Sequence, residues 1–530
     1  MLIVLPILLL IGIPLFLVSL RFLRPKTGIL WLISALTALA VWIMLMIFRL
    51  KIPDSATFGL GKSLSFSFIT TFLLDKISWP YAWALIASLL AMILTSVVYR
   101  SVEDSPSPNW TIWPQGSLLA GLGLSAIFAG NLYTLILSWT AIDLFLLYLM
   151  VTNLNSTQDA LVSFAIRVAG TFVAIGAILA NSQGTPISLP LVNQNVNTLV
   201  FIGSLIRLGS IGVSWKARQL SIPQQGMKSF INLVLVTSVL VVITRGSSSG
   251  ISSNLIPIFL VIISIVAMIF GIMAYLTIKE MWWRFYWIMG FSAISIVAAI
   301  QGEVEASLAW GVALLLPGSL ILYYYARMRS IYVFLFFGIL GISALPFTPA
   351  WLGIRIYPIP GQMMEQSIWW LMILLAQSFL TACFILVTIH QRQALGGAER
   401  WVWIVYPLGL IFLVVTQYTI LIFGIPGLSN DLLAFPSLIF SWINLAVIAL
   451  TIGVMWTIHR ANQSLSRLYL HLARITPYAW CERAYQVIFI IIRRFLQFID
   501  QILEGKGGIL WTLLFLLLLI ALLIQFTARG

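Results

Sequence analysis

The stretch from Asn131 to Val151 reads NLYTLILSWTAIDLFLLYLMV and holds one carboxylate, Asp143, inside an apolar run of helix length. A carboxylate at membrane depth costs at least about 2.5 kcal/mol, so it marks an ion path, a proton relay or an internal ion pair. A structural pair with an Arg of a neighbouring helix is the simpler interpretation, because such pairs also occur inside helix bundles. The stretch alone leaves these roles of Asp143 open.

The composition around this stretch is that of a polytopic membrane protein. Of the 530 residues, 61% are hydrophobic and 8% are charged, whereas a soluble domain carries about 25% charged residues. Apolar runs long enough for a span number about sixteen when each span takes roughly 20 residues. The net charge of +14 does not indicate nucleic acid as a partner, because Lys and Arg in the loops orient helices in a bilayer.

No catalytic or cofactor motif stands out. Cys383 lies in a predicted span and Cys481 in a distant surface segment, so the sequence predicts neither a disulfide nor a metal site. The sequence shows no Gly-rich phosphate loop, no Ser-His-Asp arrangement and no haem or iron–sulfur spacing. We therefore expect no catalytic residue, no metal and no cofactor in this chain.

Two later spans each carry a cation. The predicted span Asp159–Asn181 holds Arg167 one third of the way in, and Val196–Ser214 holds Arg207 at its centre. Because an unpaired charge inside a span is costly, we predict that Asp143 and Arg207 are partners across the interface of their helices. Arg167 is the alternative partner, in a structural ion pair.

Two stretches predict interruptions of a span. Gly209 and Gly212 follow Arg207, which favours a locally opened helix that lines a polar cavity, with a helix kinked for packing as the alternative. The predicted span Ile331–Leu345 runs into Pro346 and Pro349, which must interrupt it.

The connections also carry signals. We predict a tight turn near Gly130-Asn131 and, from the alternating segment Ser63–Phe68, a short hairpin on the membrane face. Near the carboxyl end, apolar residues at helical spacing in Glu482–Glu504 predict a helix along the membrane surface, followed by an anchor span, Ile509–Phe526. A helix packed on a partner is the alternative for Glu482–Glu504.

Several of these segments resemble the antiporter-like membrane subunits shared by respiratory complex I, membrane-bound hydrogenases and Mrp-type cation/proton antiporters. The resemblance covers most of the chain, and the Pro-rich break is its most specific part. The matching segments are Phe72–Ser78, Asn131–Leu149, Ile206–Gly209 with Trp215, Gly341–Trp351 and the carboxyl-terminal surface helix with its anchor.

The resemblance implies an all-α fold of two inverted five-helix repeats, each with a broken helix, joined by a central polar axis that relays protons. It implies other membrane subunits as partners and no redox cofactor in this chain. The expected divisions are 1–110 for amino-terminal helices, 111–249 and 250–395 for the two repeats, 396–460 for further bundle helices, and 461–530 for the surface helix and anchor.

Transfer of the family's proton path to this sequence gives five positions. The acidic position is Asp143, or is absent with Thr140 in its place. Arg207 takes the place of the seventh-helix Lys, and Arg355 lies within one position of the twelfth-helix Lys. The eighth-helix Lys falls near Thr237 or Ser238, which leaves no ionisable group there.

The sequence therefore predicts a multi-pass membrane subunit of a complex that moves protons or monovalent cations. We expect this complex in a bacterial inner membrane. The alternative is a structural subunit of such a complex that has lost conduction. An unrelated multi-spanning enzyme, such as a lipid-linked glycosyltransferase, is a distant third. The sequence does not decide whether the assembly is an NADH:quinone oxidoreductase-type or hydrogenase-type enzyme.

Overall fold

The computed structural model describes the chain in segments. The described residues are 2–22, 27–60, 68–98, 110–153, 157–179, 189, 193–211, 222–277, 282–327, 331–345, 348–357, 369–389, 393–394, 400–423, 446–447, 449–453 and 494. The chain divides into two units, Met1–Trp456 and Thr457–Gly530. All helices and strands named below belong to the first unit.

Long apolar helices make up most of the described residues. The α-helices are α1 (Leu5–Arg21), α2 (Thr27–Phe48), α3 (Ser78–Thr95), α5 (Ile112–Ile127), α6 (Leu132–Asn153), α7 (Thr157–Leu179), α8 (Gln194–Gly209), α9 (Ile222–Gly246), α10 (Ile256–Leu276), α11 (Trp283–Ile300), α12 (Val304–Leu322), α13 (Ile331–Ile342), α14 (Trp369–Ile389) and α15 (Val402–Phe423). The 3-10 helices are η1 (Leu2–Val4), η2 (Arg49–Lys51), η3 (Ser96–Val98) and η6 (Trp351–Ile356), and the strands are β1 (Asp54–Leu60), β2 (Phe68–Leu74), β3 (Ala326–Arg327) and β4 (Gln393–Ala394).

Eleven helices in the described segments are long and apolar enough to cross a membrane, and α13 is a shorter apolar helix. In hydrocarbon the backbone has no water to bond with, so an apolar chain satisfies its N–H and C=O groups within helices. The predicted class, an all-α multi-pass membrane protein, is confirmed. The total of about sixteen spans stays a prediction.

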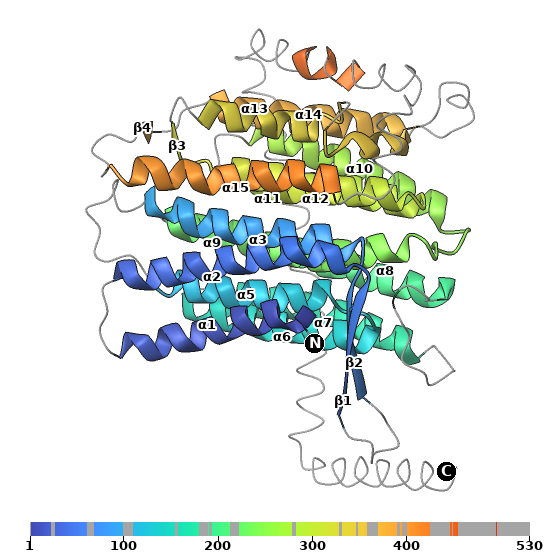
Figure 1. The fold of residues 1–530 in the computed structure, drawn as a ribbon. Helices are drawn as coiled ribbons and strands as arrows, with labels where there is room; N and C mark the ends of the chain where they lie inside the picture. The colour runs from blue at the N-terminus through green and yellow to red at the C-terminus, as the bar shows by residue number, and fades with distance from the viewer. Residues whose placement is uncertain are drawn as a thin grey trace, which may run out of the picture. The chain divides into compact units, whose positions relative to one another are not determined.

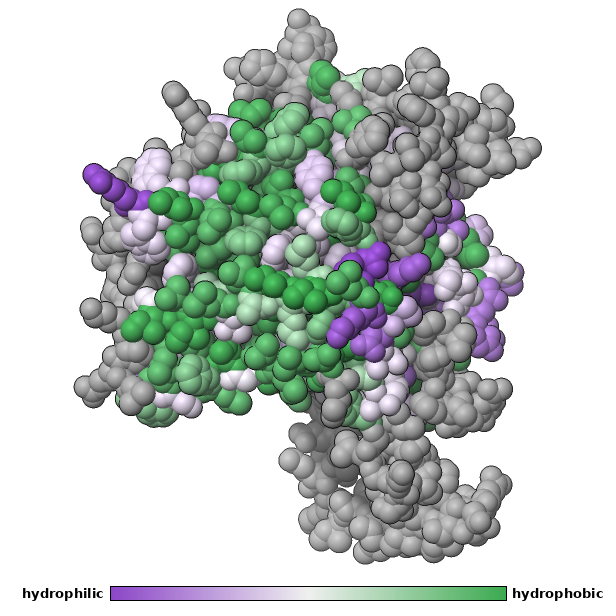
Figure 2. Space-filling model, in the orientation of Figure 1, coloured by the Kyte–Doolittle hydropathy of each residue, from purple (hydrophilic) through white to green (hydrophobic). Residues whose placement is uncertain are grey.

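Burial separates an inner group of helices from an outer group. In the span window of α3, 94% of residues are buried, against 33% for α1 and for α10. Figure 1 shows the long helices lying side by side. Figure 2 shows a broad hydrophobic face over them, with hydrophilic residues gathered toward the helix ends. The outer helices therefore present an apolar surface suited to lipid or to a neighbouring membrane protein.

Two sets of five helices have the same pattern of neighbours. In the first set α5 contacts α6 and α9, α6 contacts α7, and α8 contacts both α7 and α9. In the second set α10 contacts α11 and α14, α11 contacts α12, and α13 contacts both α12 and α14. Each set thus closes into a ring in the same chain order, as two repeats would. The inverted symmetry and the domain limits stay predictions.

Two predicted spans end earlier than the sequence indicates. The helix α8 ends at Gly209 rather than Ser214, two residues after Arg207. The helix α13 ends at Ile342 rather than Leu345, because Ala344 has a φ of 51°, a left-handed conformation that an α-helix does not admit. The chain then continues as η6, so the predicted interruption is present. Residues 212–221 and 346–347 lie outside the described segments.

The predicted hairpin is present with other strand limits. Strands β1 and β2 pair antiparallel from Asp54 opposite Leu74 to Leu60 opposite Phe68, and of the alternating Ser63–Phe68 all but Phe68 lies outside the described residues. The predicted turn at Gly130-Asn131 joins α5 to α6, and the Gly130 N–H donates to the Thr71 carbonyl at 2.8 Å. The hairpin is thereby tied to the start of α6. Its place on a membrane face stays a prediction.

Three predictions near the carboxyl end cannot be compared in full. The predicted bundle-helix region 396–460 is described at 400–423, 446–447 and 449–453, and the predicted surface helix is described at Arg494. The anchor span Ile509–Phe526 lies outside the described residues.

Candidate functional site

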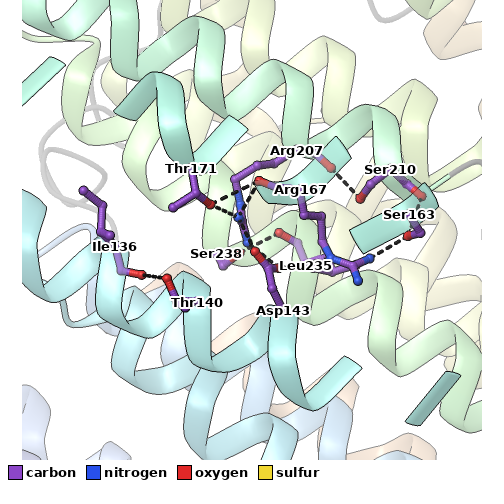
Figure 3. A network of polar contacts seen from close by, with 10 residues as sticks. All are labelled: Ile136, Thr140, Asp143, Ser163, Arg167, Thr171, Arg207, Ser210, Leu235 and Ser238. Atoms are coloured by element: carbon purple, nitrogen blue, oxygen red, sulfur yellow. Dashed lines mark hydrogen bonds and ion pairs between the residues drawn. The ribbon is translucent and has the colours of Figure 1, made fainter. Parts of the chain in front are cut away.

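Three charged side chains from consecutive helices meet inside the first five-helix set. Asp143 comes from α6, Arg167 from α7 and Arg207 from α8, and their exposed fractions are 1%, 0% and 2%. Figure 3 shows the two Arg side chains converging on the Asp143 carboxylate. We call these three residues the buried triad. The predicted pairing of Asp143 with Arg207 is confirmed.

Arg207 holds the carboxylate with both ends of its guanidinium. Its Nη1 lies 2.7 Å from Asp143 Oδ2 and its Nη2 lies 2.9 Å from Asp143 Oδ1. The same Nη1 also donates to Thr171 Oγ1 at 2.5 Å, and the guanidinium lies 4.4 Å from the Trp139 ring centroid. This bidentate, stacked arrangement uses properties of Arg that Lys does not have.

Arg167 reaches the same carboxylate from the other side. Its Nε lies 3.0 Å from Asp143 Oδ1, and its Nη1 donates to Ser163 Oγ at 2.6 Å. The sequence treated Arg167 and Arg207 as alternative partners of Asp143, and the structure brings both to it. Thr140, the alternative to Asp143 as the acidic position, lies on the exposed face of α6 and donates to the Ile136 carbonyl.

A close crossing of α7 and α8 lets Arg207 reach Asp143. A Cβ added to Gly170 would lie 2.5 Å from the Gly203 carbonyl oxygen and 2.6 Å from Arg207 Cγ. Both distances are far below normal contact, and one of the atoms is backbone. Glycine at this crossing is therefore a requirement of the buried triad.

We expect Gly170→Ala to lower the free energy of unfolding by about 1–3 kcal/mol, since the added methyl group must push the two helices apart. Gly176→Ala is the matched control on the same helix, because a Cβ there meets nothing within 4 Å. Thermal unfolding in detergent measures both. Equal effects of the two substitutions would contradict the close crossing.

The remaining predicted positions lie apart from this charge cluster. Thr237 Oγ1 donates to the Leu233 carbonyl at 2.5 Å and Ser238 Oγ donates to the Leu235 carbonyl at 2.8 Å, both within α9. Arg355 Nη1 lies 2.7 Å from Glu305 Oε2, and these side chains are 37% and 27% exposed. The proton-path role given to these positions stays a prediction.

A second ion pair, which the sequence did not predict, ties the hairpin to the bundle. Arg245 Nε at the end of α9 lies 3.0 Å from Asp75 Oδ2, and Arg245 Nη1 donates to the Ala129 carbonyl at 2.6 Å. Burial alone opposes ionisation of Asp75, but the Arg245 charge and hydrogen bonds from Arg245 and Ser78 outweigh it and lower the pKa of Asp75. The sequence held a signal for this pair: Asp75 and Arg245 are opposite charges, each at the end of an apolar run of span length.

Uncharged hydroxyl groups of four inner helices meet near the ends of those helices. Thr244 Oγ1 lies 3.2 Å from the Tyr81 hydroxyl and 2.9 Å from Ser307 Oγ, and Ser295 Oγ donates to the Ser307 carbonyl at 2.8 Å. These four residues come from α3, α9, α11 and α12. Their hydroxyls pair with one another or with backbone carbonyl groups.

Metal-binding side chains do not gather in the parts of the chain that the structure describes: no group of three His, Cys, Asp or Glu is placed to hold an ion.

Sequence comparisons give no relatives. No protein-family model matches the chain. A search of curated proteins finds no match either.

Solved structures do match. A chain of the Mrp complex from Dietzia sp. DQ12-45-1b is similar with a TM-score of 0.70 and 13% identity, over 98% of this chain and 63% of that one. A chain of the membrane-bound sulfane sulfur reductase, an archaeal respiratory membrane complex, gives 0.65 and 15% over 97% and 100%. A chain of respiratory complex I from Thermus thermophilus gives 0.57 and 14% over 83% and 99%.

The chain therefore has the fold of antiporter-like membrane subunits, and the resemblance predicted from the sequence is confirmed at the level of the fold. It spans less than two thirds of the Mrp chain that it matches.

Proposed function

We propose that this chain is a membrane subunit of a larger ion-translocating or respiratory complex, located in the inner membrane of a bacterium. The fold shared with chains of three such assemblies supports the proposal. The outward apolar surface of its peripheral helices suits neighbouring membrane subunits as well as lipid. Its partners in this proposal are other membrane subunits, and the complex moves protons or monovalent cations.

Within that assembly the chain acts as a structural subunit that does not relay protons along its centre. One observation carries this: both oxygens of Asp143 lie within 3.0 Å of a guanidinium nitrogen. Arg stays protonated in proteins, so neither Arg can release a proton to a neighbour. Protonation of Asp143 would leave two buried cations without their counter-charge, which is costly.

The second five-helix set also supports a structural role without a proton relay. Between their first turns and their ends, α10 to α14 carry no Asp, Glu, Lys, Arg or His in the described segments. Near the interruption after α13, the Tyr357 hydroxyl donates to Gln377 Oε1 at 2.6 Å, and Gln377 is fully buried. Phenol and amide groups fix this region by neutral hydrogen bonds, and neither group exchanges protons readily near pH 7.

A second candidate function is a working relay through water around Asp143. Trp139 Nε1 and Ser204 Oγ are buried and have no hydrogen-bond partner in the described structure. Buried polar groups of this kind commonly bind internal water, which could carry protons past the fixed charges.

Proton flux separates the two candidates. Purified protein in liposomes with an imposed pH gradient should give flux equal to that of empty liposomes, and Asp143→Asn should not change it. Robust flux that Asp143→Asn abolishes would overturn the structural proposal and establish the relay. Co-purification of neighbouring subunits from the native membrane tests the assembly itself.

A further inference from the structure

The buried triad holds one more positive charge than negative. Arg167 and Arg207 carry two positive charges, and Asp143 is the carboxylate that the described structure brings to them. Asp159 lies two turns before Arg167 in α7, and its side chain is outside the described residues. The triad therefore sits inside the bundle with a net charge of +1.

Several N–H groups around the triad are also unused. Arg167 Nη2, Arg207 Nε and Trp139 Nε1 are buried and donate to no acceptor in the described structure. Trp139 stacks on Arg207, and Trp139 and Asp143 lie one helical turn apart on α6. The site therefore has free donors as well as an excess of charge.

Water satisfies free donors but does not balance a charge. A buried cation without a counter-charge is strongly unfavourable, so buried charges are paired in stable proteins. The missing partner must be negative and accept hydrogen bonds. It must also be small, because the site is enclosed by the protein. Asp143, Arg167 and Arg207 are each at most 2% exposed.

We propose that the buried triad binds one small monovalent anion of the halide class, such as chloride, with Arg167 as its main ligand. The Arg167 guanidinium lies between Asp143 and Ser163 (Figure 3), and its Nη2 is a buried donor that meets no acceptor in the described structure. The anion brings the net charge of the site to zero. This site is independent of whether the chain moves protons.

Thermal unfolding of the full chain in detergent tests the site, with chloride titrated against gluconate at constant ionic strength after long equilibration. A ligand that binds the folded state raises Tm in a saturable way, by roughly 3 °C here. Arg167→Gln removes the excess charge and should abolish the response. Arg355→Gln, which breaks the partly exposed pair with Glu305, is the control and should keep it.

Ser163→Asp gives a test that does not depend on losing stability. Ser163 Oγ lies 2.6 Å from Arg167 Nη1, so a carboxylate there replaces the anion. This variant should have a raised Tm in gluconate and no response to chloride. As a direct measure, crystals grown with bromide should show an anomalous peak beside the Arg167 guanidinium.

A wild-type Tm that is the same in chloride and gluconate overturns the proposal. That result is expected if Asp159 or a carboxylate of a partner subunit supplies the missing charge. A chloride response that Arg167→Gln leaves intact overturns it as well.

Discussion

Asp143→Asn is expected to lower the free energy of unfolding by about 3–5 kcal/mol, the usual cost of leaving a buried charge without its partner. The substitution keeps the size of the side chain and removes its charge. Two guanidinium groups, both at most 2% exposed, then lie close together inside the bundle with no carboxylate between them. Thermal unfolding in chloride-free detergent measures the loss, so that an added anion does not take the place of the carboxylate.

Glu305→Gln is the matched control for this loss. It breaks an Arg–carboxylate contact of the same 2.7 Å length, between Glu305 and Arg355, but these side chains are 27% and 37% exposed. Water solvates the charge that remains, so we expect a loss of at most about 1 kcal/mol. Similar losses in Asp143→Asn and Glu305→Gln would show that burial does not decide the strength of these pairs, and would contradict the argument for the buried triad.

The sequence predicted the partnership of Asp143 and Arg207 because charges are scarce inside apolar spans. That scarcity limits the choice of partners to a few residues. It did not predict that Arg167 joins Arg207 at the same carboxylate, since a run that is apolar on all sides does not indicate which helix face is buried. The close approach at Gly170 and Gly203 is a three-dimensional fact that no periodicity encodes.

Helix ends and loop contacts were predicted less well for a related reason. Hydropathy reports how apolar a stretch is and not where its backbone leaves the helix, so α8 and α13 end earlier than their apolar runs. Asp75 and Arg245 looked like ordinary charges at span ends. Their contact, at 3.0 Å, depends on the place of β2, whose Leu73 carbonyl also accepts from Arg245.

Arg207→Lys tests the geometry of the triad and the proposed function together. Lys keeps the positive charge but replaces a planar fork by a single ammonium group. It cannot donate to both oxygens of Asp143 with the geometry of Arg207, and it loses the stacking on Trp139. We expect a loss of about 2–3 kcal/mol in the free energy of unfolding, in line with the strength of hydrogen bonds to charged groups.

Arg167→Lys is the comparison. We expect a smaller loss in the free energy of unfolding, because Arg167 places one nitrogen against Asp143 and one against Ser163. Equal losses would mean that the bidentate contact of Arg207 adds nothing.

Arg207→Lys also introduces a group that can release a proton, as at the Lys of the family's seventh helix. We still expect no proton flux in liposomes, since Thr237 and Ser238, at the predicted position of the next cation, offer no base. Flux that appears in this variant would show that the fixed charge of Arg207 is the single block to conduction, and would contradict the argument that no base lies beyond it.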